Sequence, residues 1–244
     1  MHYIHKIETT APEKLDKKKI KKETEKFKKE IGDLQNVLYA EGKHSLLIIL
    51  QGMDASGKDG AIKHIFESMN PQGVKVVSFK KPTELEMKHD FLWRVHPHAP
   101  EKGMVTIFNR SHYEDVLIQK VHKWIDHDTV LRRYDHINKF EQMLVENGTV
   151  VLKFYLHISP EKQLERLEER LSDDTKKWKH NDADMREREL WNDYMDAYGK
   201  AIDHCPTWTI VPADNTWYKE YLVSKTVVEA MRALKMRFPG LKVG

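Results

Sequence analysis

Residues 46–60 read LLIILQGMDASGKDG, an apolar run that leads directly into a glycine-rich turn. The run predicts a buried strand, and residues 61–66 predict a helix that follows the turn. The spacing of Gly52, four intervening residues, Gly57 and Lys58 fits the P-loop pattern, in which backbone N–H groups wrap phosphates while the lysine meets their outer oxygens. The turn therefore predicts a phosphate-binding site, to which we also assign Ala55, Ser56, Asp59 and Gly60.

The turn departs from an ordinary P-loop at position 59, where Ser or Thr would ligate Mg²⁺ and this sequence has Asp. Asp54 places another carboxylate in the turn. A carboxylate in an anion-binding loop repels the bound anion unless a cation lies between them, so we expect Asp54 to hold Mg²⁺, or Mn²⁺ in its place. For Asp59 two interpretations stay open: it shares the metal, or it complements the dipole of the following helix.

Basic charge in this chain of 244 residues is concentrated near its N-terminus. Residues 13–30 carry nine Lys against five Asp and Glu, a surplus larger than the net charge of +3 of the whole chain. The rest of the chain is nearly neutral, which argues against duplex DNA or another nucleic acid as a partner. Ile20, Phe27 and Ile31 fall on one stripe of a predicted helix. Its lysines then face water, and a solvated face is favoured over a surface that collects polyanions.

Cysteine and apolar content indicate the compartment. The single cysteine, Cys205, rules out an intramolecular disulfide and suits a reducing compartment. No apolar run reaches membrane-spanning length, and residues 1–10 lack the apolar core of a signal peptide. We therefore expect a cytoplasmic protein without a membrane partner.

Short strand-like segments alternate with helical patterns along the chain. The segments are 46–50, 74–79, 104–108, 150–156 and 208–211. This alternation predicts an α/β fold of three layers, in which a five-stranded parallel sheet is covered by helices on both faces. We expect one domain over residues 1–244, with an N-terminal helical extension at 1–45 and a last helix from 216 to about 238.

Polar and charged side chains follow the strands at the positions where each strand ends. Lys80 and Lys81 follow the second strand, whereas Asn109, Arg110 and Glu114 follow the third. In an open parallel sheet the ligand crevice lies at the carboxyl ends of the strands, so these residues converge on the edge that carries the glycine-rich turn. This composition suits phosphoryl transfer, which needs charge neutralisation and in-line positioning more than covalent chemistry.

Residues 171–191 read LSDDTKKWKHNDADMRERELW and are denser in charge than the rest of the chain. They predict a helix end, a polar connection and a new helix capped near Asn181 or Asp182. Lids of nucleotide kinases have this character, because closure brings Arg and Lys over the phosphates. A solvated helical hairpin is the alternative, and the segment taken alone favours it.

Several motifs occur in a fixed order along the chain: GMDASGKDG at 52–60, KKPT at 80–83, FNRSHYEDV at 108–116, INKFEQML at 137–144, KFYLHIS at 153–159 and KKWKHNDADMRERELWNDYMDAY at 176–198. Together they closely resemble the family-2 polyphosphate kinases, over about residues 38–217. The resemblance implies a P-loop kinase core with a helical lid, which uses Mg²⁺ to transfer a phosphoryl group between inorganic polyphosphate and a nucleotide. It also implies a homodimer or homotetramer.

Matched position by position, the resemblance implies catalytic roles for Asp54, Lys58 and Arg110. It implies the same for Arg188, which matches the lid arginine of the family, and it makes Arg186 a second lid cation. Lys80 and Lys81 would extend the cationic path for the polymer.

Two positions near the third strand bear on the metal and on the acceptor. Asn109 stands where family members often have a carboxylate near the metal, which puts a metal role for residue 109 in doubt and gives more weight to Asp54. Glu114, within the sequence SHYED, resembles the subgroup that accepts both nucleoside monophosphates and diphosphates. The resemblance therefore implies conversion of AMP to ADP and of ADP to ATP.

Two other functions use similar sequence features. A nucleoside monophosphate kinase with ATP as donor would share the fold, the turn and the lid, but it needs an adenine pocket on the donor side that the sequence does not identify. A nucleotide-binding switch predicts a hydroxyl residue after Lys58 and an NKxD element after a strand. The sequence NKFE at 138–141 lies within a helical pattern instead.

Overall fold

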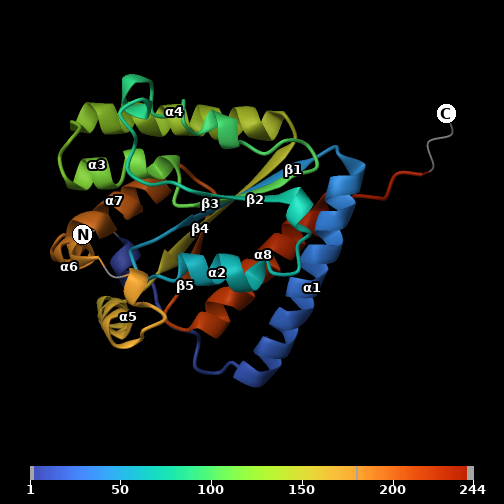
Figure 1. Cartoon of the computed structure of the whole chain (residues 1–244), viewed down its shortest axis with the longest axis horizontal. Coiled ribbons are helices and arrows are strands. Elements are labelled where there is room, and N and C mark those ends of the chain that lie inside the picture. The colour runs from blue at the N-terminus through green and yellow to red at the C-terminus, as the bar shows by residue number, and fades with distance from the viewer. Residues whose placement is uncertain (1–2, 180, 241–244) are drawn as a thin grey trace.

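The computed structural model describes residues 3–179 and 181–240, and these contain one five-stranded sheet. Its strands are β1 (Ser45–Gln51), β2 (Val74–Ser78), β3 (Val105–Asn109), β4 (Thr149–His157) and β5 (Trp208–Pro212). All neighbouring strands pair in parallel, in the order β2-β3-β1-β4-β5 (Figure 1). The prediction of a parallel five-stranded α/β sheet is confirmed.

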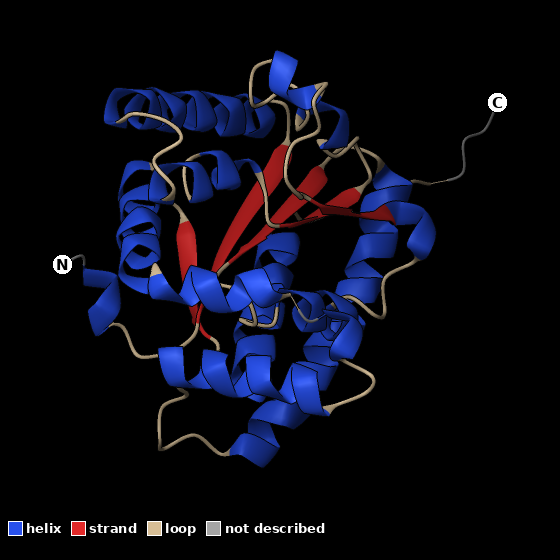
Figure 2. Cartoon of the chain, turned by 60° about the vertical axis from the view of Figure 1, so that its left-hand side comes forward, coloured by secondary structure: helices blue, strands red, loops and turns tan. Residues whose placement is uncertain are grey.

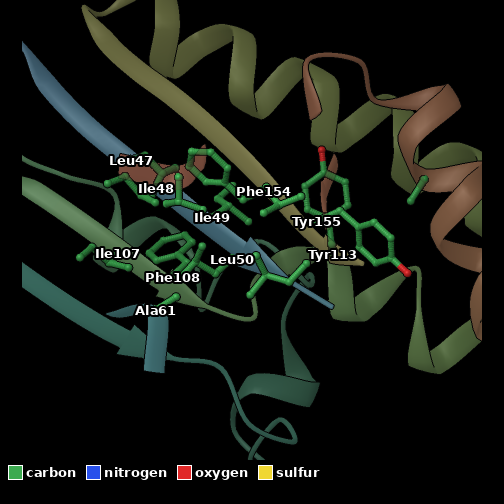
Figure 3. Close-up of a cluster of buried hydrophobic side chains, with 14 of the residues drawn as sticks. Leu47, Ile48, Ile49, Leu50, Ala61, Ile107, Phe108, Tyr113, Phe154 and Tyr155 are labelled. Atoms are coloured by element: carbon green, nitrogen blue, oxygen red, sulfur yellow. The ribbon is translucent and has the colours of Figure 1, made fainter. Parts of the chain in front are cut away.

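Strand β1 is the centre of the core. All seven of its residues are buried, because β3 and β4 flank it and helices cover both faces of the sheet. Figure 3 shows Ile48 and Leu50 of this strand among the aromatic rings of Phe108 and Phe154. The register places Leu50 opposite both Asn109 and Phe154, so these three strands end at the same edge of the sheet.

Two groups of helices form the outer layers. One face of the sheet carries α1 (Lys17–Glu41), α2 (Lys58–Ile65) and α8 (Thr216–Ala233), and the other carries α3 (Ile118–Val121), α4 (His127–Glu146) and α7 (Trp191–His204). In Figure 1 the second group lies at the top and the first group below the strands, and Figure 2 shows the sheet enclosed between them. The predicted three-layer arrangement is therefore observed. Within the described residues, no helix combines the length and the apolar composition that crossing a bilayer demands.

The N-terminal region is only partly helical. Asp16 caps the start of α1, and Gly42 ends it with a φ of 63°. The buried stripe of α1 packs along α8, as its apolar spacing predicts, and most of its lysines are exposed. Lys28 is the exception, because it is buried and pairs with Glu25 and Glu220. The residues before α1 cross the carboxyl end of β5, where the Thr9 hydroxyl donates to the Asp214 carboxylate at 2.8 Å. Of the predicted extension at 1–45, the described part thus holds a 3-10 helix at Tyr3–Lys6, a connection without regular structure, and the helix over 17–41.

The C-terminal helix is shorter than predicted. We expected it to reach about residue 238, but α8 ends at Ala233. The expectation was wrong because Lys235 adopts a left-handed conformation with a φ of 50°, which stops the helix before Pro239 does.

The charged segment at 171–191 has the predicted form. Helix α5 (Pro160–Ser172) ends, a polar connection follows, and α6 (Asp182–Glu189) begins with Asn181 as its cap. The Asn181 side chain accepts from the N–H of Ala183 at 3.0 Å. His180, which lies inside the predicted lid, is outside the described residues.

Candidate active site

The glycine-rich turn joins β1 to α2, and two of its glycines hold conformations that side chains rarely adopt. Gly52 has a φ of 148°, and a Cβ there would lie 2.6 Å from the Leu156 carbonyl oxygen. Gly57 has a φ of 91°, and a Cβ there would collide with the Lys219 ammonium. Gly52 is required because the turn passes directly against the backbone of β4, and Gly57 because its positive φ would strain any other residue.

Four side chains donate to backbone carbonyl oxygens of the turn. The pairs are Lys58 to Gly52 at 2.7 Å, Gln163 to Asp54 at 3.0 Å, Arg166 to Ala55 at 3.0 Å and Lys219 to Gly57 at 3.0 Å. In a trans peptide the C=O and the next N–H point in opposite directions, so these bonds turn the following N–H groups away from α5 and α8. The turn is thereby held with amide groups available to an anion.

Sequence reasoning did not single out Gln163, Arg166 or Lys219. Arg166 and Arg170 lie four residues apart on α5, the helix that follows β4, and this spacing on a strand-end helix was the available signal. No local pattern marks Lys219, which lies on α8 far along the chain from the turn. Burial lowers the pKa of Lys219 to about 8, and the nearby charge of Arg166 acts in the same direction.

Three charged side chains meet beside the turn: Asp54, Lys58 and Arg110. Asp54 forms an ion pair with Arg110. Burial alone would raise the pKa of Asp54, but the cations of Arg110 and Lys58 outweigh it and hold that pKa below its usual range. Burial lowers the pKa of Lys58 to about 8, and Arg110 acts in the same direction. Asp54 is therefore ionised at neutral pH, while Lys58 remains largely protonated.

The segment after β3 completes this edge of the site. Arg110 has a φ of 61°, and its N–H donates to the Leu50 carbonyl oxygen at 3.0 Å, which fixes the side chain beside the turn. The Asn109 amide donates to the Asp59 carboxylate at 2.8 Å, so Asp59 orients a neighbouring side chain as well as beginning α2. Burial raises the pKa of Glu114, against the opposing effects of Arg110 and Lys58.

A cavity of about 650 Å³ opens beside the turn, between the strand ends, α5 and the lid. Cations from five different parts of the chain line it: Lys58, Lys80, Arg110, Arg166, Arg170 and Lys176. Of the predicted site residues, it also has Asp54, Ala55, Gly57, Asp59, Gly60 and Asn109 in its walls. The side chain of Ser56, a residue of the turn, is fully buried, and Lys81 lines a different cavity.

The lid places its two predicted arginines away from this cavity. Arg188 donates to the Pro160 carbonyl oxygen and to the Gln163 side chain, both at 3.1 Å, so it contacts α5. Arg186 is exposed on α6. Two charged lid residues line the cavity instead: Lys176, and Asp184, which pairs with Arg170 at 2.7 Å. The catalytic roles of Arg188 and Arg186 stay predictions.

The carboxylates fit a magnesium ion that takes most of its ligands from phosphates and water. Within residues 3–179 and 181–240, no three side chains of His, Cys, Asp or Glu gather into a metal cluster. Mg²⁺ in phosphoryl-transfer sites is commonly bound by one or two carboxylates together with substrate phosphates. Asp54 supplies one ionised carboxylate. Burial raises the pKa of Asp184, and the nearby charge of Asp54 acts in the same direction.

Comparison with known proteins agrees with this geometry. The family model described as Polyphosphate kinase 2 matches residues 14–239. The chain is 48% identical over 210 residues to an AMP/ADP-polyphosphate phosphotransferase of Meiothermus ruber, and the match covers 84% of this chain and 79% of the relative. It is 42% identical over 225 residues to an ADP-polyphosphate phosphotransferase of Rhodopseudomonas palustris, and this match covers 86% of this chain and 78% of the relative.

A solved structure extends the likeness to three dimensions. The crystal structure of polyphosphate kinase 2 from Arthrobacter aurescens superposes with a TM-score of 0.94 at 40% identity, covering 98% of this chain and 88% of that one. The likeness in three dimensions therefore extends over nearly the whole chain. This chain belongs to the polyphosphate kinase 2 family.

Proposed function

We propose that this chain transfers the terminal phosphoryl group of inorganic polyphosphate to AMP and to ADP, giving ADP and ATP. The observation that carries the proposal is the similarity, at 48% identity, to a relative named for both acceptors and for polyphosphate. The cavity agrees with a donor that presents only repeated anionic units, because its cations come from the turn, β2, β3, α5 and the lid.

The residues of the turn and Arg110, which follows β3, have different roles. The backbone amides of the turn and Lys58 bind the phosphate that is transferred, while Arg110 stabilises the charge that develops on it. Asp54 is positioned to hold Mg²⁺, which when bound would neutralise phosphate charge and align the donor and acceptor oxygens. Asp184, brought by the lid, is the second carboxylate available to the same ion.

A donor-exchange assay tests the function. Purified protein is given AMP or ADP with Mg²⁺ and either polyphosphate or ATP as the only donor, and the products are separated by chromatography. We expect ADP from AMP, and ATP from ADP, with polyphosphate alone. Transfer to AMP with ATP as the only productive donor would instead identify a nucleoside monophosphate kinase, and no transfer from either donor would refute both.

Glu114 is proposed as the residue that extends the acceptor range to AMP. Its carboxyl lies within electrostatic reach of Arg110 and Lys58, and it lines a cavity of about 200 Å³ together with Asp54 and Arg110. We expect Glu114→Asn to lower kcat/KM for AMP about tenfold more than for ADP. The two rate constants are measured side by side, and equal losses on both acceptors would remove Glu114 from acceptor selection.

The state of assembly is proposed on the family resemblance alone. We expect a homodimer or homotetramer in solution. Light scattering coupled to size-exclusion chromatography measures the mass directly, and a monomer at micromolar concentration would contradict the expectation.

A further inference from the structure

Residues 7–11 form an N-terminal segment that lies against the carboxyl ends of β4 and β5. The Ile7 carbonyl oxygen lies 3.2 Å from Nε2 of His157, the last residue of β4. Because a carbonyl oxygen can only accept, Nε2 is the donor of this bond. The Ala11 N–H donates to the Asn215 side chain, just beyond β5, at 2.8 Å. The segment is thus bound at the edge of the sheet that also carries the glycine-rich turn.

Asp214 is the residue through which this segment reaches α5. Its N–H donates to the Thr9 carbonyl oxygen at 3.0 Å, and its carboxylate accepts from the Thr9 hydroxyl at 2.8 Å. The other carboxylate oxygen accepts from the Ser159 N–H at 2.9 Å. Ser159 caps the start of α5, so one carboxylate joins the N-terminal segment to the first turn of that helix. Hydrogen bonds to a carboxylate are stronger than those between neutral groups.

Helix α5 carries two of the side chains that orient the glycine-rich turn. Arg166 donates from one terminal nitrogen to the Asp214 carbonyl oxygen at 3.0 Å, and from the other to the Ala55 carbonyl oxygen at 3.0 Å. Gln163 donates to the Asp54 carbonyl oxygen at 3.0 Å. The positions of both side chains therefore depend on where α5 begins and on the loop that follows β5.

A continuous set of hydrogen bonds thus runs from the Thr9 hydroxyl to the backbone of the turn. Each of these bonds is partly buried, where water competes less for the donors and acceptors. Without the Thr9 hydroxyl, one carboxylate oxygen of Asp214 would lose its donor inside the protein. The start of α5 and the Arg166 guanidinium would then be held less firmly.

We propose that Asp214 is a positioning residue for phosphoryl transfer and that the N-terminal segment acts on the turn through it. This inference rests on the proposed function, because it names residues that set the geometry of the same reaction. Neither Thr9 nor Asp214 is among the described residues that line the cation-lined cavity, so both act by aiming the amides of the turn. Packing alone is supplied by Ile4, which is fully buried, and would not need the Thr9 hydroxyl.

Replacement of Thr9 by valine removes the hydroxyl donor and keeps nearly the same volume. With polyphosphate as donor, we expect Thr9→Val to lower kcat about fivefold while KM for ADP stays within twofold. Thr9→Ser, which keeps the hydroxyl, should hold kcat within twofold of the wild type. Thr10→Val is the matched control, since Thr10 is exposed and next in the chain, and all its constants should equal those of the wild type.

A double-mutant cycle shows whether Thr9 acts through Asp214. Asp214→Ala removes the acceptor of both donors, so we expect kcat to fall about tenfold, and the addition of Thr9→Val should lower it no further. A further fivefold loss in the double variant would overturn the route through Asp214.

Amide exchange at Ser56 separates this inference from the proposed function, because it needs no substrate. The Ser56 N–H donates to the Met53 carbonyl oxygen at 3.1 Å inside the turn, so its exchange rate, measured by NMR, reports how firmly the turn is held. We expect about fivefold faster exchange in Thr9→Val and no change in Thr9→Ser or Thr10→Val. Unchanged exchange or unchanged kcat in Thr9→Val would overturn the inference. If polyphosphate supports no transfer by the wild type but Ser56 exchange still depends on Thr9, the proposed function fails and the coupling of the N-terminal segment to the turn stands.

Discussion

The glycine-rich turn and the lid both border the cation-lined cavity, but they are held in place differently. The turn follows a fully buried strand, and its carbonyl groups receive hydrogen bonds from buried or half-buried side chains of α5 and α8. In the lid helix α6, none of the described side chains is fully buried. Its polar contacts with the rest of the molecule join Asp184 to Arg170, Glu187 to His122 and Tyr194, and Arg188 to Pro160 and Gln163.

The difference assigns separate tasks to the two regions. A phosphate cradle must keep its amides aimed before substrate arrives, which rigid packing and buried hydrogen bonds achieve. A lid must open and close on each turnover, which requires contacts that cost little to break. Substitutions should therefore affect the chemistry most at the turn and the motion most at the lid.

The largest effect is expected at the charges inside the turn. Lys58→Ala or Arg110→Ala should lower kcat by roughly 100-fold or more, because each removes a preorganised cation from the transferred phosphate. Steady-state assays measure the loss, and circular dichroism checks that the fold is retained. Lys63→Ala, an exposed lysine on the same helix as Lys58, is the control and should keep full activity. Near-normal turnover in either turn variant would exclude that side chain from the mechanism.

Raising the pH should remove the positive charge of Lys58 without any substitution. The pKa of Lys58 is lowered to about 8, so the ammonium is present below that pH and is lost above it. We expect kcat/KM for polyphosphate to fall above about pH 8, with a slope that approaches tenfold per pH unit. Lys58→Arg should abolish the fall even if the variant is slower overall, because arginine stays charged. A fall that persists in this variant would point to Lys219, whose pKa is also about 8.

Lys219 tests whether orientation of the turn matters separately from its charges. Lys219→Met removes the donor to the Gly57 carbonyl oxygen but leaves the catalytic side chains in place. We expect kcat/KM to fall about tenfold, because the amides of the turn would point less well at the phosphate while the charges of Lys58 and Arg110 remain. The melting temperature should stay equal or rise, because burying a lysine that is only 2% exposed costs stability.

A control on the same helix distinguishes this role from a general effect of α8. Lys225→Met, which removes a half-exposed lysine paired at the surface, should change neither activity nor stability. Loss of stability in Lys219→Met without a larger loss of kcat/KM would show that Lys219 serves packing alone.

The smallest effect is expected at the lid. Glu187→Ala removes the contacts that α6 makes with His122 and Tyr194, at 3.0 Å and 2.6 Å. These partly exposed contacts are worth roughly 1 kcal/mol, so amide exchange across α6 should become about fivefold faster while kcat changes less. Hydrogen exchange followed by mass spectrometry measures the first quantity. Glu189→Ala on the exposed side of α6 should leave exchange unchanged, and equal exchange in both variants would mean that Glu187 does not hold the lid.

Much of this site follows from short stretches of sequence. The glycine spacing at 52–60 predicts the turn, and the apolar runs predict strands whose ends carry Lys80, Asn109, Arg110 and Glu114 to one edge. These features are local: a strand that is buried on both faces must be apolar throughout, and a tight turn needs glycine wherever a side chain would collide.

Other parts of the site depend on distant contacts. Arg188 was predicted as the lid arginine from its place in a motif, yet its side chain donates hydrogen bonds to α5. The orientation of a polar lid helix about its own axis is set by tertiary contacts and not by the spacing of residues in the sequence. The separate cavity that Lys81 lines was not predicted either, because its walls come from connections between elements, and the packing of such connections leaves no periodic pattern in the sequence.

The sequence by itself determined the order of strands and helices along the chain, the glycine-rich turn and the set of charges at the strand ends, since each depends on residues close together along the chain. Only the tertiary structure decided which side chains orient that turn. Gln163, Arg166 and Lys219 lie more than 100 residues beyond the carbonyl groups they bind. Hydrogen bonds depend on distance and angle in space, which folding fixes and which neighbouring residues in the chain do not reveal.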